Sequence, residues 1–376
     1  MTMKTENDNK NLNVPNLRFP EFSGEWEKTT LGKTCNVLMC KRILASQTNT
    51  ESGVPFYKIG TIGGAPDAYI SKELFDIYKA KYNYPQKGEV MITCAGTVGK
   101  TIIFDGNDAY YQDSNIVWID NPTNKIDNTF LYHYFSQIDW SKLNTTTIVR
   151  IYNDDLRQLK ISYPSTEEQK KISHLLNLVN QRIATQIKII EKLESLIKGL
   201  CQKLFRFKEY TTYFLGDICS ITTGKLDANA MVENGKYPFF TCAEEVFNIA
   251  NYAFDTEALL ISGNGANLGY IHYYNGKFNA YQRTYVLDKF TIDINYIRLY
   301  LETFLKNRIE QEKNIGNTPY IVLGTLSKMK IKVPNILTQQ KIVKTLTSLK
   351  DKLSNEKLTL EKYKEQKWYL LSNLFI

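Results

Sequence analysis

The chain has 376 residues and a mass of 43.5 kDa, which is enough for two or three domains of ordinary size. Hydrophobic residues make up 43% of it and charged residues 23%, which excludes a wholly disordered or a fibrous protein. The 47 lysines and arginines exceed the 39 aspartates and glutamates, and the net charge of +8 permits a polyanionic partner without requiring one.

The N-terminal segment 1–14 is polar, and we expect a disordered leader there and no signal peptide. No apolar run approaches the ~20 residues that a membrane span needs. We therefore expect a cytoplasmic protein with no membrane partner. The cysteines form no CxxC pair and the histidines lie far apart in the sequence, which predicts free thiols and no metal site.

Residues 15–163 are predicted to form a β-rich domain. Short apolar runs in this region are separated by glycine, asparagine and aspartate, as is typical of strands joined by turns. The elements that we expect are strands at 54–59, 89–93, 101–104 and 115–119, a helix near 127–138 and a last strand at 159–163.

Residues 164–205 have a different composition, with no proline and one glycine between Thr166 and Phe205. Apolar residues recur there at alternating steps of four and three, a spacing that predicts a helix packed along its length against another helix. Such a helix is a rod of roughly 50 Å. Its packed positions are Ile172, Leu176, Val179, Ile183, Gln186, Ile190, Leu193, Ile197, Leu200 and Leu204.

The rest of the chain repeats this organisation at an offset of about 170 residues. Gly99 corresponds to Gly269 and Gln112 to Gln282, so residues 206–333 are predicted to be a second β-rich domain. Residues 334–376 are predicted to be a second long helix, with packed positions Ile342, Leu346, Leu349, Leu353, Glu356, Leu360, Tyr363, Lys367, Leu370 and Leu374. We expect an α+β fold with pseudo-two-fold symmetry, in which the two helices pair as an antiparallel coiled coil.

The polar position of each helix falls near its middle. In an antiparallel pair, Gln186 and Glu356 would approach each other and could determine the register of the two helices. A polar residue that the seam merely tolerates is the alternative.

The order of these four segments resembles the specificity subunit of type I restriction-modification systems. The resemblance depends on the segments 17–22 (LRFPEF), 24–26 (GEW), 95–100 (AGTVGK) and 164–172 (PSTEEQKKI), together with the duplication. It implies two target-recognition domains that each read one half of a split site in double-stranded DNA. It also implies that partner subunits carry out catalysis, so that this chain is not an enzyme and binds no cofactor. Two modification subunits would methylate adenine with S-adenosylmethionine, and restriction subunits would use ATP and magnesium.

Two motifs that could indicate other chemistry have simpler interpretations. The loop at 94–101 is one residue short of a phosphate-binding P-loop, and Cys94 stands where the first glycine is needed. Because Tyr270 replaces Lys100 in the second copy, we expect a tight turn between strands. The segment 168–170 (EQK) resembles part of a nuclease motif, but we interpret it as a solvated helix face.

We expect polar residues in the loops of both domains to contact DNA, since base edges are read by arginine, lysine, asparagine and glutamine. The candidates in the first domain are Lys41, Arg42, Lys58, Thr97, Lys100, Gln112, Asp113, Ser114, Arg150 and Tyr152. Those in the second domain are Lys225, Asn264, Asn267, Gln282, Arg283, Thr284, Asn317 and Tyr320. Gln112 and Gln282 are the leading candidates, and a glutamine that caps a turn is the alternative for each.

The sequence therefore predicts a DNA-specificity subunit, and it leaves two other hypotheses open. One is a nucleotide- or DNA-processing enzyme that uses the loop at 94–101. The other is a scaffold whose coiled coil joins proteins. Hydrolysis of ATP by the purified chain would favour the first, and failure to bind DNA would favour the second.

Overall fold

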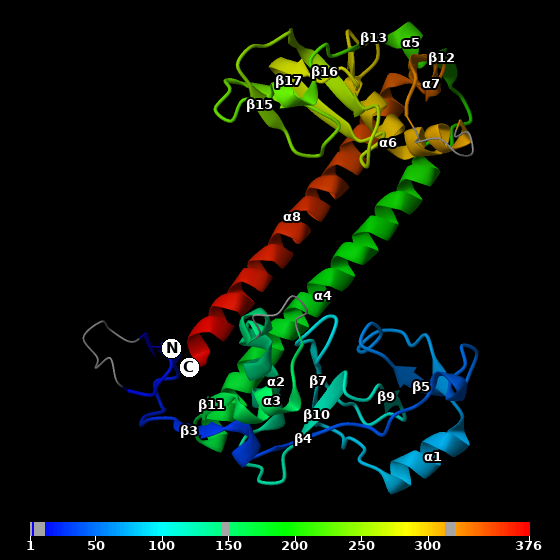
Figure 1. Ribbon diagram of the computed structural model, residues 1–376. Coiled ribbons are helices and arrows are strands. Elements are labelled where there is room, and N and C mark those ends of the chain that lie inside the picture. The colour runs from blue at the N-terminus through cyan, green and yellow to red at the C-terminus, as the bar shows by residue number, and fades with distance from the viewer. Residues whose placement is uncertain (1, 4–11, 144–149, 313–319) are drawn as a thin grey trace. The chain divides into compact units, whose positions relative to one another are not determined.

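The structure is a computed structural model that describes residues 2–3, 12–143, 150–312 and 320–376. The chain divides into two compact units (Figure 1). Unit 1 consists of Met1–Ile187 and Thr359–Ile376, and unit 2 consists of Lys188–Leu358. Both long helices are therefore shared between the units.

Part of the predicted leader, residues 1 and 4–11, lies outside the described residues. Its other residues include a short strand, β1 (Thr2–Met3), which pairs antiparallel with β2 (Leu17–Arg18).

The central sheet of unit 1 has four antiparallel strands, in the order β4 (Asn36–Leu38), β10 (Ile116–Asp120), β7 (Val90–Thr93) and β8 (Thr101–Ile103). A second sheet has the order β6 (Tyr69–Ile70), β5 (Val54–Tyr57) and β9 (Tyr110–Tyr111). A two-stranded sheet joins β3 (Glu27–Thr30) to β11 (Lys160–Tyr163). The helices are α1 (Lys72–Lys81), α2 (Asn128–Gln137), α3 (Asn153–Gln158) and the start of α4 (Thr166–Leu204), with 3-10 turns at Leu31–Lys33, Ala45–Gln47 and Trp140–Leu143.

Unit 2 has the same plan in a single larger sheet. Its strand order is β13 (Ser220–Thr223), β18 (Thr284–Asp288), β16 (Phe254–Ser262), β17 (Ile271–Ala280), β14 (Tyr237–Phe240) and β15 (Phe247–Ile249). A two-stranded sheet joins β12 (Thr211–Phe214) to β19 (Lys330–Val333). The helices are α5 (Leu215–Ile218), α6 (Ile294–Gln311), α7 (Leu323–Ser327) and most of α8 (Ile336–Leu374), with a 3-10 turn at Ala228–Ala230.

The internal repeat is confirmed by strand pairing as well as by strand order. β5 pairs parallel with β9, and β14 pairs parallel with the end of β17, whereas every other pairing between these strands is antiparallel. The helix that follows each central sheet is capped in the same way. Asp127 accepts a hydrogen bond from the backbone N–H of Phe130 at the start of α2, and Asp293 accepts one from Tyr296 at the start of α6.

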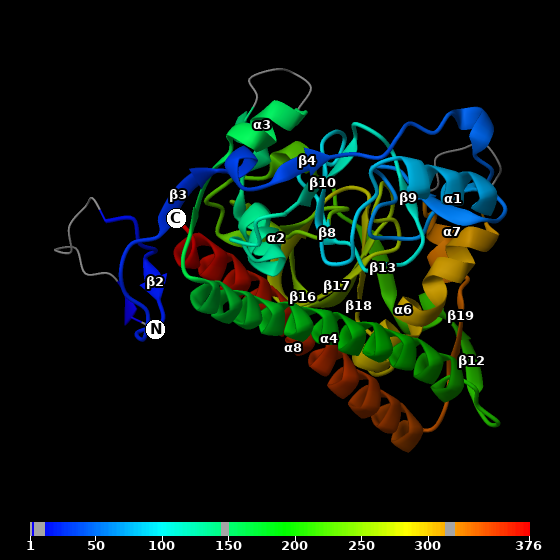
Figure 2. The same cartoon turned by 90° about the horizontal axis from the view of Figure 1, so that it is seen from below.

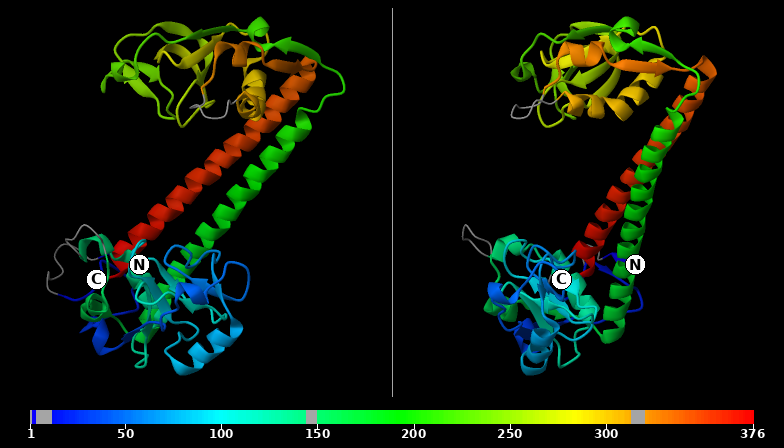
Figure 3. Two further views of the ribbon diagram at one scale, coloured as in Figure 1. Left: turned by 45° about the vertical axis from the view of Figure 1, so that its right-hand side comes forward. Right: turned by 90° about the vertical axis from the view of Figure 1, so that its right-hand side faces the viewer.

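The two long helices pack against each other in both units. In unit 1, Ile172 and Leu176 near the start of α4 share a core with Leu370 and Leu374 near the end of α8. In unit 2, Ile197 near the end of α4 shares a core with the start of α8. Within each unit, therefore, the start of one long helix lies beside the end of the other, and the two segments run antiparallel (Figure 3). All of the predicted packed positions are buried or half-buried.

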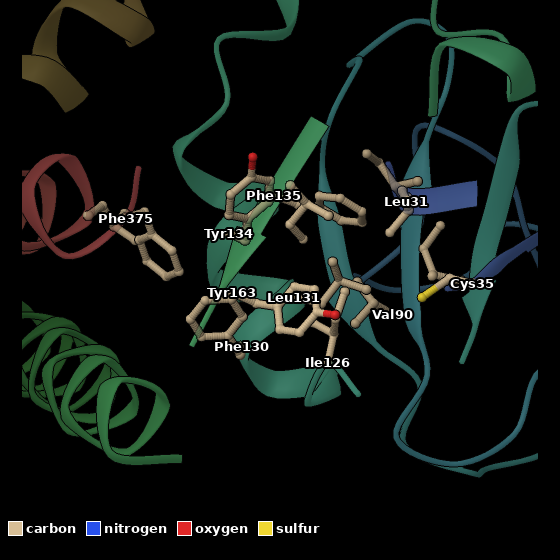
Figure 4. Close-up of a cluster of buried hydrophobic side chains, with 14 of the residues drawn as sticks. Leu31, Cys35, Val90, Ile126, Phe130, Leu131, Tyr134, Phe135, Tyr163 and Phe375 are labelled. Atoms are coloured by element: carbon tan, nitrogen blue, oxygen red, sulfur yellow. The ribbon is translucent and has the colours of Figure 1, made fainter. Parts of the chain in front are cut away.

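The core of unit 1 contains a residue from the far end of the sequence. Figure 4 shows Phe375, which follows α8, beside Phe130 and Tyr134 of α2. Helix α2 also lies along α4 (Figure 2), where the His133 ring nitrogen Nε2 is 3.0 Å from Asn177 Oδ1. The end of α8 thus completes the hydrophobic core that supports the first central sheet.

The interpretation of residues 168–170 as a solvated helix face is wrong for two of the three residues. Glu168 is buried and forms an ion pair with Arg18, at 2.7 Å. Gln169 is also buried, and its amide donates to the backbone oxygens of Lys125 and Pro164. The physical reason is that the first turn of α4 packs against Arg18 on one side and against the segment that precedes α2, at Lys125 and Asp127, on the other. Charge patterning within the helix cannot reveal these contacts.

Candidate nucleic-acid interface

Three segments of unit 1 meet at Cys94. The backbone N–H of Cys94, at the end of β7, donates to the oxygen of Asn115 at 2.7 Å. The N–H of Ile151 donates to the oxygen of Cys94 at 2.9 Å. The β7–β8 loop, the turn before β10 and the segment before α3 are therefore joined by backbone bonds that do not depend on side-chain identity.

Unit 2 contains the same arrangement around Gly263. Its N–H donates to Arg283 at 2.9 Å, and its oxygen accepts from the N–H of Ile321 at 2.8 Å. Asn115 of unit 1 thus corresponds to Arg283 of unit 2. The backbone is the same in the two units but the polar side chains differ, as expected of two sites that bind related ligands with different specificity.

A glycine shapes the β7–β8 loop and its counterpart. Gly99 has a φ of +82° and Gly269 a φ of +83°, a conformation that L side chains rarely adopt. A Cβ atom at Gly99 would lie 2.1 Å from Trp140, and one at Gly269 would lie 2.8 Å from Ile309. Only glycine lets the loop turn this closely against the domain.

The P-loop hypothesis for residues 94–101 is wrong, and the predicted turn between strands is confirmed. A P-loop places its lysine at the start of a helix whose N-terminus faces the phosphates. Here the loop leads from β7 into its antiparallel neighbour β8. Burial raises the pKa of the Cys94 thiol to about 12, so this thiol is poorly suited to be a nucleophile.

A cavity of about 340 Å³ lies beside this junction in unit 1. Five of the predicted DNA-binding residues line it, namely Arg42, Lys58, Gln112, Asp113 and Ser114. Thr48 and Asn115 also line it. The sequence analysis missed these two residues because nothing in their local patterns distinguishes them from ordinary turn residues.

Contacts with the protein orient several side chains of this cavity. The Arg42 Nε donates to Asp113 Oδ2 at 2.8 Å, and Lys58 pairs with Asp67 at 2.9 Å. The Gln112 Oε1 accepts a long hydrogen bond of 3.4 Å from the backbone of Ile59. The cavity therefore presents two cations and a carboxylate in a partly ordered arrangement.

Four other candidates in unit 1 do not line the cavity. Thr97 and Lys100 lie exposed on the β7–β8 loop, and the Lys100 Nζ donates to the backbone oxygen of Ile62. The Arg150 guanidinium donates to the oxygen of Ser114 at 3.3 Å and lies over the ring of the exposed Tyr152.

Lys41 does not line the cavity. Its Nζ lies 5.6 Å from the centre of the Tyr82 ring, and its side chain is exposed.

The candidates in unit 2 divide by exposure. Four have exposed side chains: Lys225, Gln282, Arg283 and Tyr320. Asn264 and Asn267 are half-buried, and Asn267 donates to the backbone oxygen of Cys242 at 3.3 Å. Thr284 is completely buried because it is the first residue of β18, so its side chain has no surface to offer DNA and that prediction is corrected. Asn317 lies outside the described residues.

The strand register also corrects the correspondence between the two glutamines. The N–H of Gln112 donates to Tyr57 at the end of β5, and the N–H of Tyr281 donates to Phe240 at the end of β14. Gln112 therefore corresponds to Tyr281 in space, and Gln282 lies one residue further along. The turn of unit 1 contains an additional residue before its central strand, which an alignment at constant offset cannot detect.

In the part of the chain that the structure describes, no three His, Cys, Asp or Glu residues are grouped to hold a metal ion. No described helix is both long and apolar enough to cross a membrane.

The family model of the type I restriction modification DNA specificity domain matches this chain twice, over residues 23–195 and 208–362. A Haemophilus influenzae protein named as a type I restriction enzyme specificity subunit is 52% identical over 147 residues, which are 39% of this chain and 38% of that protein. The type I restriction enzyme EcoDI specificity subunit of Escherichia coli is 40% identical over 154 residues, which are 41% of this chain and 34% of that protein. The chain thus matches less than half the length of either relative.

Solved structures share the fold over nearly the whole chain. The type I restriction-modification S subunit from M. genitalium has a TM-score of 0.66 at 20% identity, covering 96% of this chain and 99% of that one. A second structure, described as showing complex assembly and conformational transition of a type I restriction-modification system, has a TM-score of 0.58 at 16% identity. It covers 93% of this chain and 97% of the other.

Proposed function

Because the chain belongs to the type I restriction modification DNA specificity domain family, we propose that it is the sequence-specific DNA-binding subunit of a type I restriction-modification complex. The observation that supports this proposal best is the duplicated backbone junction at Cys94 and Gly263, which carries different polar side chains in the two units. Two such readers on one chain would recognise a DNA site in two parts with different sequences.

The side chains around both junctions are suited to DNA. Arginine, lysine, glutamine and asparagine can read base edges, and threonine, tyrosine and lysine can bind phosphates. Unit 1 offers Arg42, Gln112 and Lys100 for these roles, and unit 2 offers Arg283 and Gln282. The remaining candidates in each unit would contribute contacts at the edges of the interface.

The charge distribution indicates that this chain needs partner subunits in order to bind DNA tightly. Residues 15–163 carry 16 basic and 16 acidic residues, and residues 206–333 carry 14 and 13. The excess of positive charge lies on the helical segments, with seven basic and four acidic residues in 164–205 and eight and four in 334–376. Since phosphate contacts supply most non-specific affinity, the recognition domains alone would bind DNA weakly.

We infer that partner subunits supply the missing affinity and all of the chemistry. Two modification subunits would bind with this chain and methylate adenine using S-adenosylmethionine, and restriction subunits would add ATP- and magnesium-dependent cleavage. The complex would work in the cytoplasm. The long helices would set the distance between the two half-sites, because a continuous helix is stiff over tens of ångströms.

The experiment that tests the proposal is to purify the chain with its modification subunit, methylate a plasmid library and map the modified adenines. We expect a site in two specific parts with a non-specific spacer of constant length. Methylation at a continuous, unsplit site would contradict the two-reader proposal. DNA binding by the complex should also weaken steeply with salt.

A matched experiment tests the role of the helices. Inserting four residues into α4 and four into α8 should change the spacer length or abolish methylation. An unchanged spacer in an active complex would contradict the role of the helices in setting the distance. Mutations in the loops of either unit are the control, because they should alter one half-site and leave the spacer unchanged.

A further inference from the structure

Arg42 and Asp113 form an ion pair with a particular geometry. The hydrogen bond runs from the Arg42 Nε to Asp113 Oδ2 at 2.8 Å. The Arg42 side chain is 66% exposed and the Asp113 side chain only 18% exposed. The carboxylate is therefore held in the protein surface, and it orients an arginine that extends outward from it.

The contact through Nε leaves the other end of the guanidinium available. Arginine has five N–H donors, and four of them lie on the two terminal nitrogens. Among the described residues, Asp113 is the one hydrogen-bond partner of this guanidinium. The terminal fork of Arg42 is thus oriented and exposed at the rim of the cavity that Gln112 and Ser114 also line.

The turn that carries Asp113 is itself held firmly. Ser114 has a φ of +53°, which is uncommon for a residue other than glycine. Its backbone oxygen accepts a hydrogen bond from Arg150, and the backbone N–H of Gln112 is bonded to β5. Asp113 is therefore fixed on both sides along the chain, and it can act as a rigid support for Arg42.

We propose that Arg42 reads a guanine in the half-site recognised by unit 1, and that Asp113 is the residue that positions it. This inference rests on the proposed function. Guanine presents two acceptors, O6 and N7, in the major groove, and the planar fork of an arginine matches both. Adenine presents a donor at the position of O6 and would leave one N–H of the fork unsatisfied.

The same pair does not occur in unit 2. Lys41 and Lys225 correspond in the repeat, so Leu226 takes the place of Arg42. Arg283 is in the turn of unit 2, but no carboxylate beside it corresponds to Asp113. The guanine requirement that we infer therefore belongs to one half-site, and loss of the pair should leave the other half-site unaffected.

The experiment measures base preference with the complete complex. Wild-type chain and its variants are assembled with the modification subunit, given DNA randomised at every position of both half-sites, and the methylated products are sequenced. Arg42→Ala should reduce the preference for guanine at one position of one half-site by about 10- to 100-fold. Arg42→Lys should restore part of the preference, because lysine supplies a charge without a fork.

Asp113→Ala provides a readout that a merely structural role would not give. Arg42 would keep its charge but lose its support, so guanine preference should fall while binding to non-specific DNA stays the same or becomes tighter. Arg42→Ala should reduce both the preference for guanine and the binding to non-specific DNA. The matched control is Arg157→Ala, which removes another exposed arginine of unit 1 that pairs with an aspartate at 2.8 Å, and it should change neither quantity.

Two outcomes would overturn the inference. One is an unchanged base preference in Arg42→Ala, and the other is a loss of preference for a base other than guanine. If the wild-type complex does not recognise a site in two parts, the proposed function fails together with this inference. If the wild-type complex recognises a site in two parts and Arg42→Ala leaves the base preference unchanged, only this inference fails. Unchanged melting temperatures would show that the exposed substitutions leave the fold intact.

Discussion

The ring of Phe375, just beyond the end of α8, packs against Phe130 of α2 with 5.1 Å between ring centroids. Its counterpart in the repeat is Phe205, which follows α4 and packs against Tyr300 of α6 at 5.3 Å. Each central sheet is thus backed by a helix whose aromatic residues receive a phenylalanine from the end of a long helix. In unit 1 the long helix that supplies this phenylalanine, α8, comes from the other end of the sequence.

Replacing Phe375 with alanine should destabilise unit 1 by about 3 kcal/mol, the usual effect of removing a buried phenylalanine. Hydrogen exchange should show faster opening of α2 with little change in α6. Phe205→Ala should give the opposite pattern. Ile376→Ala is the control, since this neighbour is 44% exposed, and equal effects of all three substitutions would contradict the packing described here.

The ion pair between Arg18 and Glu168 should contribute strongly to stability. Its side chains are 14% and 2% exposed, and Arg18 also donates to the backbone oxygen of Gly24. Arg18→Ala leaves a buried carboxylate without its partner, so we expect a loss of about 3 kcal/mol in urea unfolding. Lys171→Ala, which breaks an exposed ion pair with Glu21, should lose less than about 1 kcal/mol. Equal losses would contradict this interpretation.

His133 should make unit 1 sensitive to acid. Burial lowers the pKa of its imidazole to about 4, and Asn177, Lys367 and Asp127 are the groups that act on it. Because the folded pKa is below the unfolded value of about 6.5, the unfolded chain binds the proton first. Stability should therefore fall as the pH drops from about 6.5 to about 4, by about 3 kcal/mol at most.

The measurement for His133 is urea unfolding at pH 7.5 and pH 5.0. His133→Gln should lose most of the difference in unfolding free energy between these two pH values. His174→Gln, which replaces an exposed histidine of α4, should keep it. A difference that survives in His133→Gln would assign the acid sensitivity to other groups.

Gly99→Ala should impair DNA recognition by unit 1. The substituted Cβ would collide with Trp140, so the loop that carries Thr97 and Lys100 must move. We expect about tenfold weaker binding of cognate DNA by the complex, measured by titration at constant salt. Gly265→Ala is the control, because Gly265 has a similar φ of +81° but no atom within 4 Å of its Cβ position. A similar loss in both variants would mean that backbone strain alone is responsible.

Local patterns were sufficient to predict three of the four strands of the first central sheet and the two long helices. The apolar run at 89–93 became β7, and the spacing of four and three residues became α4, because both signals arise from which face of an element is buried. The repeat was visible because matching residues serve matching structural roles, as Gly99 and Gly269 do in their loops. These features depend on neighbours in the sequence.

The site and other tertiary contacts were harder to predict because they depend on residues that are distant in sequence. Glu168 looked solvated on its own helix, and its partner Arg18 lies 150 positions away. Thr284 looked like a turn residue until the register of β18 placed it in the sheet. The pairing of Arg42 with Asp113 likewise requires the fold, since 71 positions separate the two.

The division of the chain has a consequence for synthesis on the ribosome. Unit 2 is continuous from Lys188 to Leu358, so its core can close while the rest of the chain is still being made. Unit 1 is discontinuous, because its core includes Leu370, Leu374 and Phe375. Synthesis of unit 1 thus begins before that of unit 2, but its core is completed later. Until the end of α8 has been synthesised and covers the apolar face of α2, the nascent protein must keep that face soluble.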